Sequence, residues 1–411
     1  MLYRLPERPS VVMMDHLELT KELTTLLPET DRHPYYFFGP GYSRASAGHR
    51  AFHLLIHWLN KLGEHAFLVP NLAEPVDVWT NPDLLTPILT RQALEHHQQS
   101  NVLPIVVYPE VLTGNPLQAD VVVRYLANFP GALGGPTEFD ASDVLFSYSS
   151  LIASRVGFPD NVLMPPVIDT GIFNPGPQPL DRRGCCAYFG KYVDYYKATP
   201  FGLPDNCAII TRTSPTPAQM ADIFRRSEAL YCFEDTAVAL EATLCGCPVI
   251  CMPNEHFKRL IAGEELGTDG LAWGDTPDEV ARARATVGNV FGRYQKTIPR
   301  FFTQLEHFVS VTQEHASTAA RTSAIHAEDY SWEMLPSREL AKLPQDQVNP
   351  VFRLRRYLGE LRREKDVFRL IESIARWALR GKICGVGWDG HLFIDLRGKS
   401  KTATSEQRGK I

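Results

Sequence analysis

Residues 229–250, with the sequence ALYCFEDTAVALEATLCGCPVI, constrain the fold of this chain more than any other segment. The apolar run at 229–233 suits a buried strand, and residues 249–251 begin the next one. Between them, Thr236 begins a helix of small and apolar residues, which ends at the CGCP sequence of residues 245–248. A strand, a helix and a second strand in this order predict a parallel α/β sheet.

Polar residues stand in this segment where a parallel sheet binds its ligands. Glu234 and Asp235 follow the strand directly, and Thr236 lies at the start of the helix. Ligands bind at the carboxyl ends of parallel strands, and the free N–H groups of a helix N-terminus attract phosphate. Glu241 lies one or two turns further into the helix, where a carboxylate suits ribose hydroxyls better than phosphate. These residues predict a ligand cleft at this edge of the sheet.

Length and composition exclude several classes of protein. With 411 residues, 44% of them hydrophobic and 22% charged, the chain is typical of a globular protein of two or three domains. A net charge of −5 gives no reason to expect a nucleic-acid partner. No run is apolar enough to span a bilayer, and the N-terminus lacks the apolar core of a signal peptide. Eight dispersed cysteines do not suggest a secreted disulfide framework. We therefore expect a cytoplasmic protein with reduced thiols.

The N-terminal half begins with a second βαβ pattern. Residues 34–38 suit a strand, residues 49–62 a helix, and residues 66–69 the next strand. The turn between the first two contains Gly39 and Gly41, which let backbone amides approach a ligand closely. It does not match the G-x-G-x-x-G fingerprint, which argues against a nicotinamide cofactor. The chain also lacks the G-x-S-x-G elbow and the P-loop lysine motif, which argues against a hydrolase or an NTPase.

The end of the 229–250 segment resembles the donor site of retaining GT-B glycosyltransferases, of the GT4-like type that assembles polysaccharides and O-antigens. That family carries two glutamates separated by seven residues, then Ala and a small-Gly-x-Pro-Val ending. Glu241-Ala242 and residues 245–249 match the second half of this pattern. Only six residues separate Glu234 from Glu241, so the first family position falls on Phe233. The role of Glu234 stays open for that reason, and Thr236 is expected to take part of the donor contact.

The resemblance extends to basic residues on both sides of the expected cleft. The glycine-rich turn is similar to the first loop of GT-B transferases, which implies that Arg44 and Arg50 contact phosphate or acceptor. A strand at 186–191 ends in Gly-Lys, and the resemblance implies that Lys191 and Lys197 hold the donor diphosphate. Arg212 ends a further strand, so we expect it at the same rim as Glu234 and Lys191.

The resemblance also implies the division of the chain. The glycine-rich loop at 128–136 is expected on the acceptor side, and the proline-dense stretch at 164–175 between two domains. The expected fold class is α/β, a GT-B arrangement of two Rossmann-like domains facing a cleft, plus a C-terminal helical appendage. We expect four parts: an N-terminal extension (1–33), an N-terminal acceptor domain (34–175), a C-terminal donor domain with a crossing helix (176–318), and a basic helical appendage with a disordered tail (319–411).

By this resemblance the chain is a hexosyl- or deoxyhexosyltransferase. It would move a sugar from a nucleotide-diphosphate sugar to a glycan or lipid-linked acceptor, with retention and with no metal or other cofactor. The implied catalytic residues are Glu234, Glu241 and Lys191. The implied donor contacts are Lys197, Arg212, Thr236, Asp235 and Glu241, and the implied acceptor contacts are Gly39, Gly41, Arg44 and Arg50. Two alternatives stay open: a nucleotide-sugar 2-epimerase on the same fold, and a non-catalytic module that binds a glycan or a partner, which the altered glutamate spacing favours.

Three further patterns leave alternatives open. Residues 351–382 carry ten Lys or Arg against four Asp or Glu, a net charge of +6, with apolar residues at near-helical spacing. Such a helix can lie on anionic lipid at the inner face of the membrane, or pack on its own protein or on a partner. His49, His53 and His57 share a helix face, as metal ligands could, but no further ligand is identifiable in the sequence. Three cysteines also lie close together in the sequence, at Cys245, Cys247 and Cys251. Cysteine is a common small buried residue, so we favour that role over a zinc site.

Overall fold

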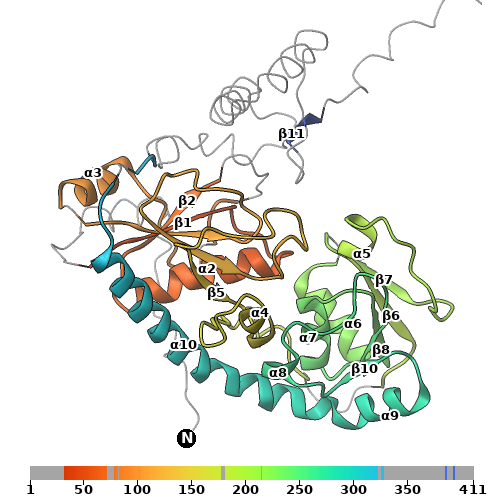
Figure 1. Ribbon diagram of the computed structural model, residues 1–411. Helices are drawn as coiled ribbons and strands as arrows, with labels where there is room; N and C mark the ends of the chain where they lie inside the picture. Colours follow the sequence, from red (N-terminus) through yellow and green to blue (C-terminus); the bar gives the residue numbers. More distant parts are fainter. Residues whose placement is uncertain are drawn as a thin grey trace, which may run out of the picture.

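A computed structural model describes residues 32–71, 78–81, 83–100, 102–176, 181–213, 215–322 and 325–327, together with one short strand pair at 385–386 and 392–393. Two parallel five-stranded sheets, each flanked by helices, make up the two halves of the described chain (Figure 1). Among the described residues, no helix is both long enough and apolar enough to cross a bilayer.

The N-terminal sheet has the strand order β2-β1-β3-β4-β5, and all four neighbouring pairs run parallel. Strands β1, β2 and β4 are fully buried, and they are apolar except for Arg124 of β4, which pairs with Asp143. The bounds are β1 (Tyr35–Gly39), β2 (Ala66–Pro70), β3 (Ile105–Pro109), β4 (Val121–Leu126) and β5 (Val144–Ser147).

The C-terminal sheet has the order β10-β9-β8-β6-β7 and is also parallel. In both sheets the strand order reverses beside the first strand, which places a ligand crevice at the carboxyl ends of the central strands. The bounds are β6 (Cys185–Phe189), β7 (Ala208–Thr211), β8 (Ala229–Cys232), β9 (Val249–Cys251) and β10 (Leu271–Trp273).

Several helices begin at a residue whose side chain satisfies a free backbone N–H group. Ser46 caps α2, and Thr216 forms a reciprocal capping box with Gln219 at the start of α6. The helical bounds are α2 (Ala47–Lys61), α3 (Arg91–Gln99), α4 (Ser150–Arg155), α5 (Lys191–Asp194), α6 (Pro217–Arg226), α7 (Ala237–Leu244), α8 (Gly263–Leu266), α9 (Pro277–Thr286), the 3₁₀ helix η1 (Val287–Asn289) and α10 (Val290–Thr318).

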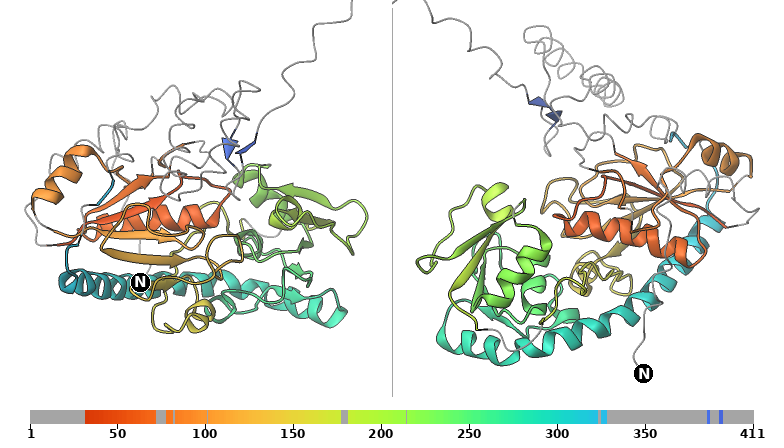
Figure 2. Two further views of the ribbon diagram at one scale, coloured as in Figure 1. Left: turned by 45° about the horizontal axis from the view of Figure 1, so that its top comes forward. Right: turned by 180° about the vertical axis from the view of Figure 1, so that it is seen from behind.

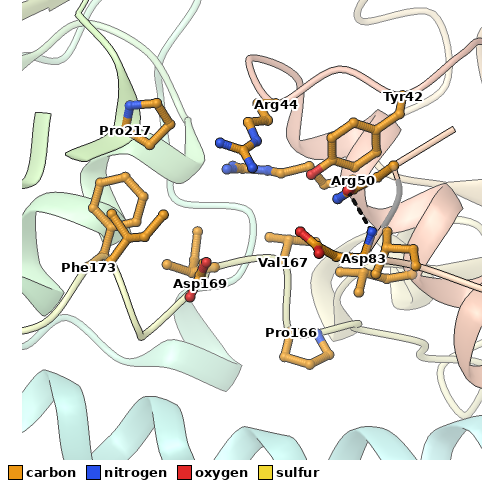
Figure 3. Close-up of a pocket in the computed structure, with 14 residues that line it drawn as sticks. Tyr42, Arg44, Arg50, Asp83, Pro166, Val167, Asp169, Phe173 and Pro217 are labelled. Atoms are coloured by element: carbon orange, nitrogen blue, oxygen red, sulfur yellow. Dashed lines mark hydrogen bonds between the residues drawn. The ribbon is translucent and has the colours of Figure 1, made fainter. Parts of the chain in front are cut away.

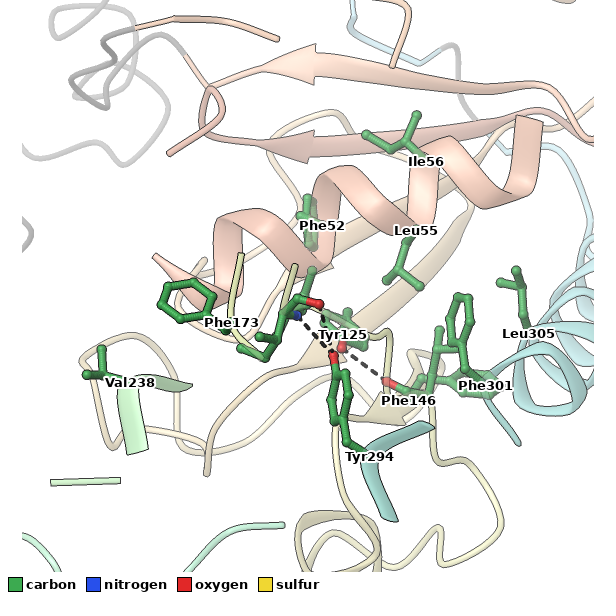
Figure 4. Close-up of a cluster of buried hydrophobic side chains, with 14 of the residues drawn as sticks. Phe52, Leu55, Ile56, Tyr125, Phe146, Phe173, Val238, Tyr294, Phe301 and Leu305 are labelled. Atoms are coloured by element: carbon green, nitrogen blue, oxygen red, sulfur yellow. Dashed lines mark hydrogen bonds between the residues drawn. The ribbon is translucent and has the colours of Figure 1, made fainter. Parts of the chain in front are cut away.

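Helix α10 connects the two domains along one side of the molecule (Figures 1 and 2). It begins beside the C-terminal sheet, where the Tyr294 hydroxyl accepts a hydrogen bond from the Ile168 amide at 3.0 Å. Further along, its apolar stripe lies against the N-terminal sheet: Phe301 and Leu305 are fully buried near Phe146 of β5 (Figure 4). Because one helix packs on both halves, it restricts how the two domains can move apart.

The α/β class and the two Rossmann-like domains expected from the sequence are confirmed by the two parallel five-stranded sheets. A long helix also runs back to the N-terminal domain where a crossing helix was expected. The short helices α3, α4, α5 and α8 were not predicted. Most of the expected appendage, including residues 351–382, lies outside the described residues; within its range the structure describes an antiparallel pair, β11 (Gly385–Val386) and β12 (Leu392–Phe393).

The expectation of reduced thiols is wrong for one pair of cysteines. Cys185 and Cys207 form a disulfide whose Cα atoms lie 4.9 Å apart, at the amino ends of β6 and β7. The sequence did not reveal it because the two cysteines meet only through the pairing of β6 with β7, across 22 residues of sequence. The other described cysteines are buried free thiols: Cys186, Cys232, Cys245, Cys247 and Cys251.

The packing of α10 predicts a large cost for truncating Phe308. Its ring is 1% exposed and meets the Phe146 ring edge-on, with centroids 4.9 Å apart. We expect Phe308→Ala to lower the free energy of unfolding by about 3–5 kcal/mol, because it leaves a cavity that the sheet cannot close. Chemical denaturation monitored by circular dichroism measures this change. The matched control is Glu306→Ala on the exposed face of α10, and equal effects of the two changes would contradict this role.

Candidate functional site

The candidate site lies where the carboxyl ends of the two sheets face each other. On the C-terminal side it is built by the residues that follow β6 and β8. Lys191 begins α5 directly after β6, and Glu234 and Asp235 lie in the turn between β8 and α7. Since β6 and β8 are hydrogen-bonded neighbours, their ends bring these three residues together as the sequence predicted.

Glu234 is held by backbone amides. It is 4% exposed, and its Oε2 accepts a hydrogen bond from the Tyr192 amide at 2.6 Å. Burial raises the pKa of Glu234, and the neighbouring Lys191 ammonium opposes that rise. The Glu234 carboxylate therefore fixes the start of α5. This contact alone explains why the carboxylate is buried, and no ligand is needed to explain it.

Lys191 lies between the two acidic residues. Its Nζ donates to the Asp235 carbonyl oxygen at 3.0 Å, and the Asp235 carboxylate accepts from the Ile261 amide. Burial raises the pKa of Asp235, with Ile261 and Lys191 acting in the opposite direction. Thr236 caps α7 by accepting from the Val238 amide at 3.4 Å. This corner therefore joins one ammonium group to a helix N-terminus, a combination suited to binding an anion.

Glu241 has a partner from the other domain. Its Oε1 accepts from Arg50 Nη1 at 2.9 Å, and the two side chains are 3% and 15% exposed. Burial raises the pKa of Glu241, while Arg50 lowers it. The Arg50 Nε atom is buried with no hydrogen-bond partner within the described residues. The structure thus places Glu241 against α2 of the N-terminal domain, apart from the cluster of Lys191, Glu234 and Asp235.

A cavity of about 220 Å³ opens beside this ion pair (Figure 3). Its lining comes from both domains and from the segment that connects them, and includes Tyr42, Arg44, Arg50, Asp169, Phe173 and Pro217. In Figure 3, Arg44 and Arg50 extend from the N-terminal domain toward this gap. Two of the residues predicted for the acceptor side therefore line the cavity, whereas none of those predicted for the donor side does.

The remaining predicted residues lie around these groups. Gly39 ends β1, where a Cβ atom would come within 2.9 Å of the Phe52 ring, and Gly41 accepts a hydrogen bond from the His49 ring through its carbonyl oxygen. Lys197 is exposed and donates to the Asp194 carbonyl oxygen of its own loop. Arg212 is exposed at the end of β7, with no hydrogen bond or ion pair to any described residue.

The histidines singled out as possible metal ligands bond to the backbone. His49 and His53 bond the carbonyl oxygens of Gly41 and Pro40 at 3.2 Å, and His57 accepts from the Leu85 amide at 2.7 Å. Among the residues that the structure describes, no three His, Cys, Asp or Glu side chains are grouped to hold a metal ion.

Sequence reasoning missed Glu110, which follows β3 at the carboxyl edge of the N-terminal sheet. It is 5% exposed, and its Oε2 accepts from the Ala127 amide at 3.2 Å. Burial raises the pKa of Glu110 to about 7, with backbone hydrogen bonds and Lys191 opposing the rise. An acid directly after a strand was the signal that identified Glu234, and the same rule would have found Glu110.

A hydrogen bond from a tyrosine hydroxyl also crosses between the domains. The Tyr196 hydroxyl donates to the Ala132 carbonyl oxygen at 3.4 Å, in the glycine-rich loop that was expected on the acceptor side. The Tyr196 ring stacks on His256 with centroids 3.8 Å apart, so both residues are fixed at this point. The loop at 128–136 therefore lies against the C-terminal domain.

No family model matches this chain, and no curated protein sequence matches it. Solved structures with a similar arrangement include the glycosyltransferase SnogD from Streptomyces nogalater, 12% identical with a TM-score of 0.36 over 69% of this chain and 100% of that one. A putative UDP-N-acetylglucosamine 2-epimerase from Listeria monocytogenes is 12% identical, with a TM-score of 0.33 over 73% of this chain and 94% of that one. Spinosyn rhamnosyltransferase SpnG is 14% identical, with a TM-score of 0.30 over 72% and 98%. At identities and TM-scores this low, these likenesses carry no argument about the activity of this chain.

The raised pKa of Glu110 predicts a pH-dependent effect of removing its charge. Because the folded-state pKa is about 7 and the usual value is 4.5, folding favours the neutral carboxyl. The stability from this preference is present below about pH 4.5 and is lost as the pH rises through 7. We expect Glu110→Gln to be more stable than wild type at pH 8, by up to about 3 kcal/mol, and similar at pH 4.5.

Thermal unfolding at a series of pH values measures this difference. The control is Glu138→Gln, an exposed acid on the loop that follows β4. A constant difference between Glu110→Gln and wild type at every pH would mean that Glu110 ionises normally.

Proposed function

We propose that this chain is a glycosyltransferase that moves a sugar from a nucleotide-diphosphate sugar to a glycan or lipid-linked acceptor. Retention of the anomeric configuration, independence of bound metal, and a hexosyl or deoxyhexosyl donor belong to the same proposal and rest on the resemblance of residues 241–249. The observation that carries the proposal is the grouping of Lys191, Asp235 and the capped N-terminus of α7 at the carboxyl edge of the C-terminal sheet.

The charges at this corner fit a diphosphate. Lys191 offers a compact positive charge, and the N-terminus of α7 adds the positive end of its helix dipole. Positive charge held in place before the reaction stabilises the charge that develops on a departing nucleoside diphosphate. Arg212, exposed at the end of β7, and Lys197 provide further cations at the same rim.

Glu241 can contact a ribose without losing its bond to Arg50. Arg50 engages Oε1, and no hydrogen bond from the described residues engages Oε2. A ribose hydroxyl donating to Oε2 would complete the hydrogen bonding of this carboxylate, because an ionised carboxylate accepts through both oxygens. Arg44 and Arg50 line the neighbouring cavity, where they would meet the acceptor.

A second candidate is a nucleotide-binding module without catalytic activity. The observation that favours it is the hydrogen bond from the Tyr192 amide to Glu234, since a carboxylate that caps α5 is not free to act on a sugar. Such a module would bind the nucleoside diphosphate through the same corner. Turnover of a nucleotide sugar separates the two candidates.

The first test is metal-free binding of a nucleoside diphosphate. We expect UDP, GDP or dTDP to raise the melting temperature in the presence of EDTA, since a ligand at 100 times its Kd stabilises the folded state by about 2.7 kcal/mol. Lys191→Met should abolish this shift, while Lys258→Met, an exposed lysine of the same domain, should leave it unchanged. If no diphosphate shifts the melting temperature of the wild-type chain, the proposed function is wrong.

A second test separates the two glutamates. We expect Glu241→Ala to weaken nucleoside diphosphate binding by roughly 1–3 kcal/mol, the penalty for unpairing buried polar groups. Glu234→Ala should act mainly on turnover and less on nucleotide affinity. Titration calorimetry well below the melting temperature measures the affinities, with the exposed Glu264→Ala as control. Negligible effects of both changes on affinity and turnover would favour the module without catalytic activity.

A further inference from the structure

The two faces of the C-terminal sheet are covered to different extents. On one face, residues of α6, α7 and α10 form a continuous core with β6–β9. On the other face, α9 and the residues after β6 cover only part of the sheet. Ile209 of β7, Ala187 of β6 and Tyr231 of β8 pair side by side across this second face. Ile209 is 48% exposed, so the apolar row reaches solvent at the edge of the sheet.

A groove of about 960 Å³ lies on this face between Tyr231 of the row and helix α9. Tyr231 and Ile250 form its apolar floor, and α9 lines one wall with Val280 and the exposed Ala281 and Ala285. Small side chains on a helix wall leave room for another element to approach closely. The groove is therefore shaped to receive an apolar surface of another segment.

Exposed carboxylates surround this floor. Asp205, Glu228 and Asp275 line the groove, and none of them forms an ion pair with any residue that the structure describes. Arg284 also lines the groove, which leaves an excess of negative charge around the apolar floor. An occupant that carries apolar residues together with several cations would complement both features.

Residues 351–382 of this chain have that composition. They carry a net charge of +6, and apolar side chains recur among the cations at near-helical spacing, including Phe352, Leu358, Leu361, Phe368 and Leu379. The described core ends at Ala327, where the preceding His326 amide donates to the Leu117 carbonyl oxygen. The 23 residues from 328 to 350 can extend to about 75 Å, enough to reach either domain.

We propose that residues 351–382 bind in this groove, with their apolar residues on Tyr231 and Ile250 and their cations facing Asp205, Glu228 and Asp275. In this proposal, residues 351–382 bind their own chain, and not a partner protein or a lipid surface. The carboxylates that surround the groove would repel an anionic lipid surface, so lipid does not suit this face. While residues 351–382 occupy the groove, their apolar side chains are not available to bind lipid. The proposal does not depend on the proposed transferase activity.

Carbodiimide cross-linking of the full-length chain tests the contact directly. It joins lysines to nearby carboxylates without a spacer, so we expect Lys365 or Lys382 to be linked to Asp205, Glu228 or Asp275. Mixing ¹⁴N- and ¹⁵N-labelled protein shows whether a link forms within one chain or between two. Links confined to the N-terminal domain, or links between copies, would overturn the proposal.

Hydrogen exchange provides the second measurement. In the full-length chain we expect the amides of 351–382 to exchange at least tenfold more slowly than in the variant with Glu228→Lys and Asp275→Lys. A second variant reverses charge on the segment instead of on the groove. Arg362→Glu with Arg363→Glu should release residues 351–382 while the groove residues stay unchanged. The matched control is Glu306→Lys, an exposed acid on α10 far in sequence from the groove, which should keep the protection.

Two outcomes of the exchange experiment contradict the proposal. One is equal exchange of 351–382 in wild type and in both charge-reversal variants. The other is protection that appears only after addition of vesicles containing phosphatidylserine, which would assign the segment to a lipid surface. Melting temperatures of all variants within a few degrees of wild type show that the fold is intact, since every changed residue of the groove is exposed.

Discussion

The ion pair between Arg50 and Glu241 is the contact on which the geometry of the cleft depends. It joins α2 of the N-terminal domain to α7 of the C-terminal domain. Helix α2 follows β1, and α7 follows β8, the central strand of its sheet. With Glu241 only 3% exposed, neither charge can be left alone: removing one partner of a buried pair costs about 3–5 kcal/mol. The pair therefore fixes the separation of the two sheets at the point where their carboxyl ends meet. The cavity beside the pair is lined by both domains, so its width depends on that separation.

Other hydrogen bonds between the domains lie at the periphery and also hold the domains together. Glu265 of α8 accepts from both the amide and the hydroxyl of Ser150 at 2.6 Å, and Tyr294 of α10 bonds the connecting segment at Ile168. These bonds lie on the side of the molecule that α10 spans, whereas Arg50–Glu241 and Tyr196–Ala132 cross the cleft itself. The two domains are therefore joined both along the side that α10 spans and across the cleft.

The sequence predicted what depends on local pattern. Apolar runs predicted the strands at 34–38, 66–69, 186–191, 229–233 and 249–251, which correspond to β1, β2, β6, β8 and β9, together with the acids after β8. It could not predict partners separated by long stretches of chain. Arg50 and Glu241 are 191 residues apart, and Cys185 and Cys207 meet only because β7 pairs with β6. Glu241 fitted a family pattern for ribose binding, yet nothing local indicated that an arginine of the other domain would bond it.

In both sheets, an acid that follows one strand accepts a backbone amide that follows the neighbouring strand, at the edge that faces the cleft. Glu110 follows β3 and accepts an amide that follows the neighbouring β4, and Glu234 follows β8 and accepts an amide that follows the neighbouring β6. Lys191 lowers the pKa of both carboxyls against the effect of their burial. A single ammonium group therefore holds two acids, one from each domain, closer to their ionised state. An anion bound to Lys191 would offset that charge and favour the protonated form of both acids. If Lys191 binds the diphosphate as proposed, ligand binding and the protonation of one acid from each domain are coupled through this one side chain.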